Sequence, residues 1–253
     1  MNFNQLHAQG SPLLICNVWD VASAKTAQKL NFKAIGTSSG AMANMLGYQD
    51  GEEMSLGELV YMVERITQSV NLPLTVDLEA GYSRTPTEIA EHIIQLAHLG
   101  VVGVNLEDSI VNEKRELVAA ASFAKLLQEV ATIVKQHQSS IFINVRTDTF
   151  LLNIPNKLEE TLARGHIYEQ AGADGLFVPC VENEKDINTI IQGTILPLNV
   201  MCMPALPDFN TLAALGVRRI SMGNFVFNHI NHQLKKTLKD ILHHHSFQNL
   251  FHS

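Results

Sequence analysis

Short apolar segments alternate with longer amphipathic segments along almost the whole chain of 253 residues, and this alternation constrains the fold more than any other feature. Eight apolar segments have the length of buried strands: residues 13–19, 33–38, 72–76, 101–106, 141–145, 175–178, 196–202 and 218–222. Helical spacing of apolar residues occurs in the segments between and after them: residues 22–30, 55–70, 85–99, 117–136, 157–170, 184–192, 209–215 and 225–243. A long polar connection is expected between the second strand and the helix at 55–70. Eight strand–helix repeats in a chain of this length are typical of a (β/α)8 TIM-type barrel.

A doubly wound open sheet is the main alternative for such an alternation. The first predicted strand is not followed by the glycine-rich G-x-G-x-x-G turn of dinucleotide-binding folds, and no phosphate-binding Walker sequence occurs. The chain also contains no linker and no shift in composition that would divide it. We therefore predict one barrel domain over residues 1–253.

Two carboxylates, Asp77 and Glu79, follow the third predicted strand. Side chains alternate along a strand, so the two acids are expected to point to the same side. Neighbouring acids repel each other, and a divalent cation relieves that repulsion; hard oxygen ligands suit Mg²⁺ or Mn²⁺. The alternative is a pair of solvated acids in a turn.

Polar side chains gather at the carboxyl ends of the other predicted strands, where TIM barrels carry their chemistry. These ends contain Trp19-Asp20, Ser38-Ser39-Gly40, Glu107-Asp108, Arg146 with Asp148, Pro179-Cys180, Asn199 with Met201-Cys202, and Gly223-Asn224. A metal framed by carboxylates and facing a guanidinium group and a Ser-Gly turn would suit a small anion. No lysine or histidine lies at a strand end, which disfavours a Schiff-base aldolase and a histidine-rich zinc hydrolase.

Composition and charge limit the classes of binding partner and the cellular compartment that we expect for this chain. The formal net charge is −7 and no basic run occurs, which argues against nucleic acid and anionic membranes as partners. The N-terminus does not have the pattern of a signal peptide, and no apolar run is long enough to span a bilayer. Cys16, Cys180 and Cys202 have no C-x-x-C spacing, which favours a reducing, cytoplasmic setting. The histidines at 243–245 are interpreted as a solvated helix end.

Eight segments, spread over most of the chain in order, resemble the isocitrate lyase/phosphoenolpyruvate mutase superfamily. They are NVWDVASA (17–24), GTSSG (36–40), GYQDGE (47–52), VDLEAGYS (76–83), GVNLEDS (103–109), INVRTDTF (143–150), GADGLFVP (172–179) and PLNVM (197–201). The resemblance implies an α/β barrel, often with the last helix swapped between subunits of a homodimer or homotetramer. It also implies Mg²⁺ and a substrate that is a 2-oxo acid or forms the enolate of one.

The resemblance further implies roles for individual residues. Asp77 resembles the direct metal ligand, and Glu79 and Glu107 resemble the acids that hold the water molecules of the metal. Ser39 and Gly40 resemble the turn that receives the substrate carboxylate. Four further candidates complete the catalytic and substrate-binding set. The resemblance implies Arg146, opposite that turn, and Asp50, in the loop after the second strand; Trp19 and Asn199 are candidates as lining residues from their positions at strand ends.

Two departures from the superfamily pattern limit the choice of reaction. The lyases carry a K-K/R-C-G-H loop whose cysteine acts as acid and base, and no cysteine follows Glu79 or Glu107 here. The gating loop of the mutases is matched only loosely by residues 109–118. The chain is therefore similar to the phosphonomutase-like branch, and we expect an Mg²⁺-dependent lyase or phosphonomutase-like enzyme that breaks a C–C or C–P bond through a pyruvate enolate. The alternative is a barrel that binds a 2-oxo acid and metal with little turnover.

Overall fold

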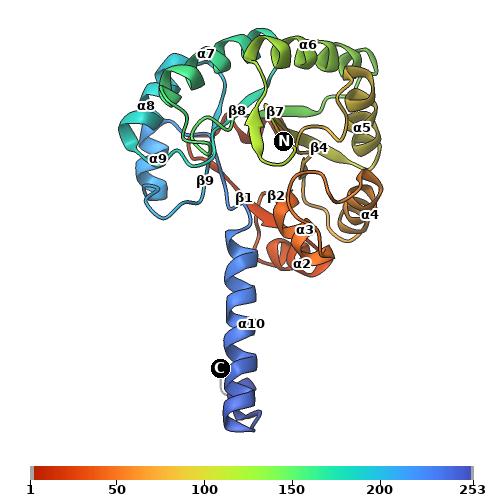
Figure 1. The fold of residues 1–253 in the computed structure, drawn as a ribbon, viewed down its shortest axis with the longest axis vertical. Coiled ribbons are helices and arrows are strands. Elements are labelled where there is room, and N and C mark those ends of the chain that lie inside the picture. The colour runs from red at the N-terminus through yellow and green to blue at the C-terminus, as the bar shows by residue number, and fades with distance from the viewer. Residues whose placement is uncertain (1–2, 252–253) are drawn as a thin grey trace.

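Eight parallel strands close into a barrel in the computed structural model, which describes residues 3–251. The strands are β1 (Leu13–Val18), β2 (Ala34–Thr37), β3 (Leu74–Asp77), β4 (Val101–Glu107), β7 (Phe142–Arg146), β8 (Gly175–Phe177), β9 (Leu198–Met201) and β10 (Arg219–Ser221). Their order around the barrel is β1-β10-β9-β8-β7-β4-β3-β2, and Figure 1 shows helices surrounding it. The predicted (β/α)8 barrel is confirmed.

Seven helices pack around the barrel with one buried face each: α2 (Val21–Lys29), α4 (Leu56–Thr67), α5 (Pro86–His98), α6 (Ala120–Gln136), α7 (Lys157–Gln170), α8 (Glu184–Gly193) and α9 (Phe209–Leu215). The buried face is apolar in all of them except α7, where it contains Thr161, Arg164 and Tyr168. Their starts follow local sequence chemistry. Ser55 and Glu58 form a reciprocal capping box at α4, and Pro86 occupies the first turn of α5, where no amide donor is needed.

The barrel interior is closed at its amino end by the short helix α1 (Phe3–Leu6), which the sequence did not predict. Its Phe3 and Leu6 pack with residues of β1, β2 and β7 in a small separate apolar cluster. Above this cluster, the strands approach closely at Gly36. A Cβ atom there would lie 2.9 Å from Ile15 Cγ2, so only glycine fits this place in β2.

Two connections near the barrel mouth differ from the expectation. The polar connection after β2 begins with helix α3 (Ser39–Leu46), whose first amides are capped by the Ser38 side chain. The segment after β4 forms an antiparallel hairpin of β5 (Ser109–Val111) and β6 (Arg115–Leu117) instead of an open loop.

The last helix, α10 (Phe225–His244), extends away from the barrel (Figure 1). Phe227 is its one buried residue, packed edge-on against Trp19 at a ring-centroid distance of 5.2 Å. No helix within residues 3–251 is long and apolar enough to cross a membrane.

Candidate active site

The side chains predicted to act together lie at the carboxyl ends of β2, β3, β4 and β7. These four strands are consecutive neighbours in the barrel, so their carboxyl ends lie together on one side of the barrel mouth. The carboxylates of Asp50, Asp77, Glu79, Glu107 and Asp148 and the guanidinium groups of Arg115 and Arg146 form what we call the acidic cluster.

Asp77 occupies the last position of β3, and its backbone amide donates to Thr37 Oγ1 at 2.8 Å. The Ser39 hydroxyl lies 2.9 Å from Asp77 Oδ2 and 3.1 Å from Asp50 Oδ1, so it links the two acids. The other oxygen, Asp77 Oδ1, is buried without a hydrogen-bond partner in the described chain. Burial raises the pKa of Asp77, and the Asp50 charge acts in the same direction. An unpartnered, desolvated carboxylate oxygen is a place where a cation would be stabilised.

Glu79 does not continue the strand, contrary to the expectation that it shares a face with Asp77 by alternation. Its φ angle is +50°, because β3 ends at Asp77 and the chain turns there. The Glu79 carboxylate instead accepts from the Glu52 amide at 2.7 Å and from the Tyr82 hydroxyl at 3.0 Å. Burial, then the charges of Asp50 and Asp77, raise the pKa of Glu79 to about 7.

Arg146 is held in place by two carboxylates at the end of β7. Its Nη1 lies 2.7 Å from Glu107 Oε1, its Nε lies 2.7 Å from Asp148 Oδ1, and the guanidinium carbon lies 5.9 Å from the centre of the Phe177 ring. Burial alone would lower the pKa of Arg146, but Glu107 and Asp148 raise it well above its ordinary value. Burial raises the pKa of Glu107 to about 8, against the effect of the arginine. Arg146 therefore presents a fixed positive charge to the mouth.

Arg115, on strand β6 of the hairpin, inserts a second guanidinium group into the cluster. Its Nη1 contacts Glu107 Oε2 and lies 3.1 Å from Asp148 Oδ2, and its Nη2 lies 3.3 Å from Asp50 Oδ2. The hydroxyl of Ser109 also accepts from Nη1 at 3.0 Å. The hairpin is thus attached to the acidic cluster through one arginine.

Three residues at strand ends do not join the acidic cluster. Asp108 is buried behind the barrel wall, where it accepts from the Thr147 hydroxyl and from Arg164 at 2.9 Å, so it serves packing against α7. Asp20 caps α2 through the Ser23 amide. The side-chain amide of Asn199 lies inside the barrel, where its oxygen accepts a hydrogen bond from the side-chain amide of Asn144 at 3.1 Å.

The substrate-lining roles of Trp19 and Asn199 stay predictions. Trp19 contacts α10 at the rim, and Asn199 is 1% exposed below the mouth. Gly40 lies nearer the acids, since a Cβ atom on it would be 3.4 Å from Asp50 Oδ1.

Cys180 and Cys202 form no disulfide, and burial raises the pKa of the Cys180 thiol, which keeps it protonated.

Sequence reasoning missed Arg115 and Ser109 as members of the cluster, and Glu52 and Tyr82 as supports of Glu79. From the sequence, Arg115 has two open interpretations, contact with the substrate when the loop closes or solvation of the loop, because the hairpin that aims it at the acids is not predicted. The sequence does contain a signal that could have identified Glu52 and Tyr82. Glu52 lies in the motif GYQDGE with Asp50, and Tyr82 lies in the motif VDLEAGYS with Glu79.

The cluster is better suited to a hydrated cation bound by one or two carboxylates than to a metal enclosed by protein ligands. Within residues 3–251, no three histidine, cysteine, aspartate or glutamate side chains are arranged to hold one ion together. Mg²⁺ usually keeps several water molecules and binds one or two carboxylates. Asp77 Oδ1, which has no partner within residues 3–251, would be one such ligand, and Glu79 and Glu107 lie on a neighbouring turn and strand where they would hold water molecules.

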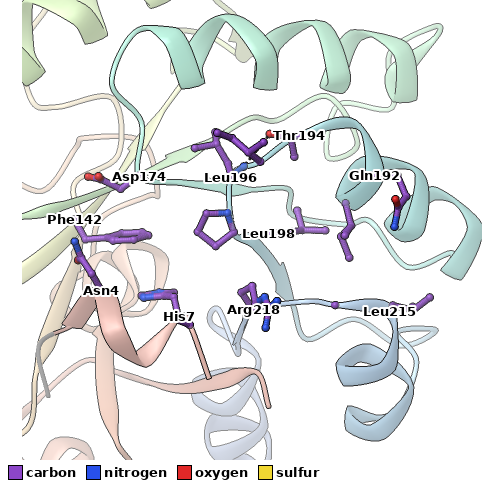
Figure 2. A pocket seen from close by; sticks show the side chains of 15 residues that line it. Asn4, His7, Phe142, Asp174, Gln192, Thr194, Leu196, Leu198, Leu215 and Arg218 are labelled. Atoms are coloured by element: carbon purple, nitrogen blue, oxygen red, sulfur yellow. Dashed lines mark hydrogen bonds between the residues drawn. The ribbon is translucent and has the colours of Figure 1, made fainter. Parts of the chain in front are cut away.

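A cavity of about 720 Å³ lies at the opposite end of the barrel, between α1, β9 and the start of β10. Figure 2 shows His7, Phe142 and Asp174 along its wall. None of the acidic cluster lines it. In TIM barrels this amino-terminal face carries stability and the opposite face carries chemistry, so we place the active site at the acidic cluster.

Residues 3–242 match the family model described as phosphoenolpyruvate phosphomutase. An uncharacterized protein of Mycobacterium tuberculosis (strain H37Rv) is 32% identical over 228 residues, which cover 90% of this chain and 84% of the relative. An oxaloacetate decarboxylase of Pseudomonas entomophila is 27% identical over 234 residues, which cover 89% of this chain and 78% of the relative.

Solved structures agree with the sequence relatives. A Burkholderia cenocepacia protein assigned provisionally as a phosphonomutase has 36% sequence identity and a TM-score of 0.88, covering 94% of this chain and 97% of its own. The similarity therefore extends over the whole barrel, including every strand that contributes to the acidic cluster.

Proposed function

The chain belongs to the phosphoenolpyruvate mutase/isocitrate lyase superfamily, and from this membership we propose that it is an Mg²⁺-dependent lyase or phosphonomutase-like enzyme for a small 2-oxo acid. The observation that carries the proposal is the buried, unpartnered Asp77 Oδ1 beside Ser39, on the same side of the mouth as the fixed charge of Arg146. Such a site pairs a cation position with an anion position.

In this proposal Asp77 binds the metal directly, and Glu79 and Glu107 orient water molecules around it. The bound metal would act as a Lewis acid on the oxygens of the 2-oxo acid. The residues around it have separate tasks. Glu52 and Tyr82 hold the Glu79 carboxylate by hydrogen bonds of 2.7 and 3.0 Å, which fixes its direction before any ligand arrives.

The substrate carboxylate would lie at the amino end of α3, where Ser39 and Gly40 follow the capping residue Ser38. Backbone amides at a helix start favour an anion. Arg146 would bind a second anionic group from the opposite side through its fork of donors. Its contacts to Glu107 and Asp148 prevent it from turning away, so the substrate would be held between β2 and β7.

Oxaloacetate and phosphonopyruvate are the first substrates to test. The oxaloacetate decarboxylases and the phosphonomutase assignment among the relatives support them. Each molecule has a 2-oxo acid group and a scissile bond at C3, and breaking that bond leaves the enolate of pyruvate. The charge that develops on the enolate oxygen would be stabilised by preorganised positive groups. Asp50, linked to Ser39 at 3.1 Å, is the proposed acid or base nearest the substrate turn.

Four finer statements belong to the same proposal: the metal is Mg²⁺, with Mn²⁺ as the alternative, the enzyme works in the cytoplasm, the chain forms one domain, and it assembles as a homodimer or homotetramer with α10 exchanged between subunits. The exposed apolar side chains of α10 support the last statement, since most of them have nothing to cover them in one chain.

The direct test follows the reaction by ¹H and ³¹P nuclear magnetic resonance. The protein is incubated with Mg²⁺ and separately with oxaloacetate, phosphonopyruvate, phosphoenolpyruvate, isocitrate and methylisocitrate, and each run is repeated with EDTA. Loss of oxaloacetate or phosphonopyruvate that EDTA abolishes supports the proposal and identifies the bond broken. Binding of 2-oxo acids without conversion of any of them would favour the binding barrel instead.

A further inference from the structure

A groove of about 490 Å³ lies beside the acidic cluster, between the loop after β3, the hairpin and α6. Its inner end is formed by Glu107, which belongs to the cluster. The residues 80–86 of the loop after β3 form one wall, and Ile110 and Val118, on and beside the hairpin, form the second. The groove is therefore continuous with the proposed active site.

The third wall is one face of α6. The side chains Ser122, Lys125, Leu126 and Glu129 all line the groove, and their spacing of three and four residues places them on a single helix face. The neighbouring Ala121 is also exposed but does not line it. Substitutions at positions 121 and 122 can therefore distinguish the groove from the general surface of the helix.

The inner part of the groove is lined mainly by hydrocarbon. Its apolar side chains are Ala80, Pro86, Ile110, Val118, Phe123 and Leu126. Four charged residues also line the groove: Glu107 of the cluster, Arg84, which is paired with Glu52 at 2.8 Å, and the exposed Lys125 and Glu129 of α6. A ligand part that fits this lining is an uncharged chain that starts near Glu107 and points toward solvent. The volume is within the range of natural ligand pockets.

The direction of the proposed substrate agrees with this position. Its carboxylate is assigned to the Ser39 turn on β2, so the rest of the molecule points toward the ends of β4 and β7. Glu107, at the end of β4, is the residue that the acidic cluster and the groove share. A substituent on C3 of the substrate would thus leave the cluster where the groove begins.

We propose that this groove is a specificity site for a hydrocarbon chain on C3, so that the preferred substrate is a 2-oxo acid longer than oxaloacetate or pyruvate. The inference rests on the proposed function, because it assumes that the 2-oxo acid head group binds at the acidic cluster. The groove then selects among 2-oxo acids by the length of the chain, through burial of apolar surface.

The test is isothermal titration of the Mg²⁺-loaded protein with oxalate, pyruvate, 2-oxobutanoate, 2-oxopentanoate and 2-oxohexanoate. Each methylene that enters an apolar groove strengthens binding by about fourfold. The affinity should therefore rise stepwise along the 2-oxo acids. Ser122→Phe, which fills the groove from α6, should remove most of this rise, and the matched control Ala121→Phe should retain it. Circular dichroism melting checks that both variants are folded.

The outcomes separate the two proposals. If oxalate does not bind in the presence of Mg²⁺, the proposed function fails, and this inference fails with it. If oxalate binds but affinity is flat along the chain series, the proposed function stands and the groove is not a specificity site. A rise that persists unchanged in Ser122→Phe would place the chain elsewhere and overturn the inference as well.

Discussion

Arg146 is held in a fixed position at the end of β7. Two carboxylates hold its guanidinium from two directions, each with a contact of 2.7 Å, and Phe177 lies beneath it. The planar guanidinium group of an arginine can donate hydrogen bonds to Glu107, Asp148 and a ligand at the same time, whereas the ammonium group of a lysine cannot. The role of Arg146 therefore depends on its shape as well as its charge.

We predict that Arg146→Lys weakens Mg²⁺-dependent oxalate binding by roughly 10- to 100-fold, the loss expected for one or two hydrogen bonds to a charged group. Isothermal titration measures the effect. The exposed Arg65 on α4 offers the control Arg65→Lys, which should bind as the unchanged protein does. Equal affinity of both variants would remove Arg146 from the substrate site.

His7 is a buried histidine far from the acidic cluster, at the amino-terminal face of the barrel. It stacks on Phe142 with ring centroids 4.4 Å apart, and its Nδ1 lies 3.1 Å from the Phe3 carbonyl, which accepts a hydrogen bond from it. Burial, with the charge of Arg219, lowers the pKa of His7 to about 4. The folded protein therefore contains the neutral ring at pH values where the unfolded chain binds a proton.

We predict a loss of stability on acidification that depends on His7. Between the unfolded pKa of about 6.5 and the folded pKa of about 4, the unfolded state binds more protons, so the free energy of unfolding falls as pH falls. The contribution from pH 7 to pH 5 is about 2 kcal/mol. Urea denaturation at both pH values should show a smaller difference for His7→Gln than for the control His98→Gln, an exposed histidine. The same pH dependence in both variants would contradict the assignment.

The β5–β6 hairpin is the element whose position most affects access to the cluster. It is joined to the barrel by the Arg115 contacts to Glu107, Asp148 and Asp50. It also packs tightly on the loop that carries Asp50, since a Cβ atom on Gly51 would lie 2.8 Å from Val111 Cβ. Both contacts hold the hairpin against the mouth.

We predict that Arg115→Met loosens the hairpin, because its three carboxylate partners lose their cation. Hydrogen exchange of the amides in residues 109–117 should become about tenfold faster or more, an estimate from the loss of partly buried ion pairs. The adjacent exposed Lys114, which pairs with the exposed Glu116 at 3.2 Å, supplies the control Lys114→Met. If exchange is equally slow in both variants, Arg115 does not fasten the hairpin.

The elements that the sequence did not predict are those whose order comes from contacts rather than from periodicity. The strands of the hairpin have three residues each, too few for an alternating pattern to be recognised. Helix α3 buries Ser39, Ala41, Met42 and Ala43, which are mostly small and are consecutive apart from Gly40, so no helical spacing of large apolar residues marks it. Glu79 does not continue the alternation of β3, because the chain turns at Glu79, Gly81 and Tyr82, which all have positive φ angles.

At the scale of the whole molecule, the barrel itself was predictable because each of its strands is a continuous apolar run between amphipathic helices. The positions of Asp77, Glu107 and Arg146 at the mouth followed from that topology alone. The ion pairs among them could not be predicted. The sequence indicates at the end of which strand a side chain lies, but it does not indicate which other side chain that residue contacts.

Helix α10 leaves a line of apolar side chains uncovered: Val226, Ile230, Leu234, Leu238 and Leu242 recur every four residues, and each is at least 38% exposed. A stripe of this length on a helix that leaves the barrel needs another surface. A second copy of the chain is the partner that the proposed exchange of α10 supplies.

We predict that the protein is a dimer or tetramer and that Leu234→Glu with Leu238→Glu converts it to a monomer, because two carboxylates cannot be buried in an apolar interface. Size-exclusion chromatography with light scattering measures the mass. The double variant Lys235→Glu with Lys239→Glu adds the same acids beside the stripe and should keep the assembly. A monomeric unchanged protein would contradict the exchange of α10.

The central claim is that Asp77 holds a metal without which no 2-oxo acid binds. The most direct measurement is isothermal titration of oxalate into the unchanged protein and Asp77→Asn, each with Mg²⁺ and with EDTA. The account predicts binding only by the unchanged protein with Mg²⁺, while both proteins melt at similar temperatures. Oxalate binding that is equal with Mg²⁺ and with EDTA, or equal in Asp77→Asn, would contradict it.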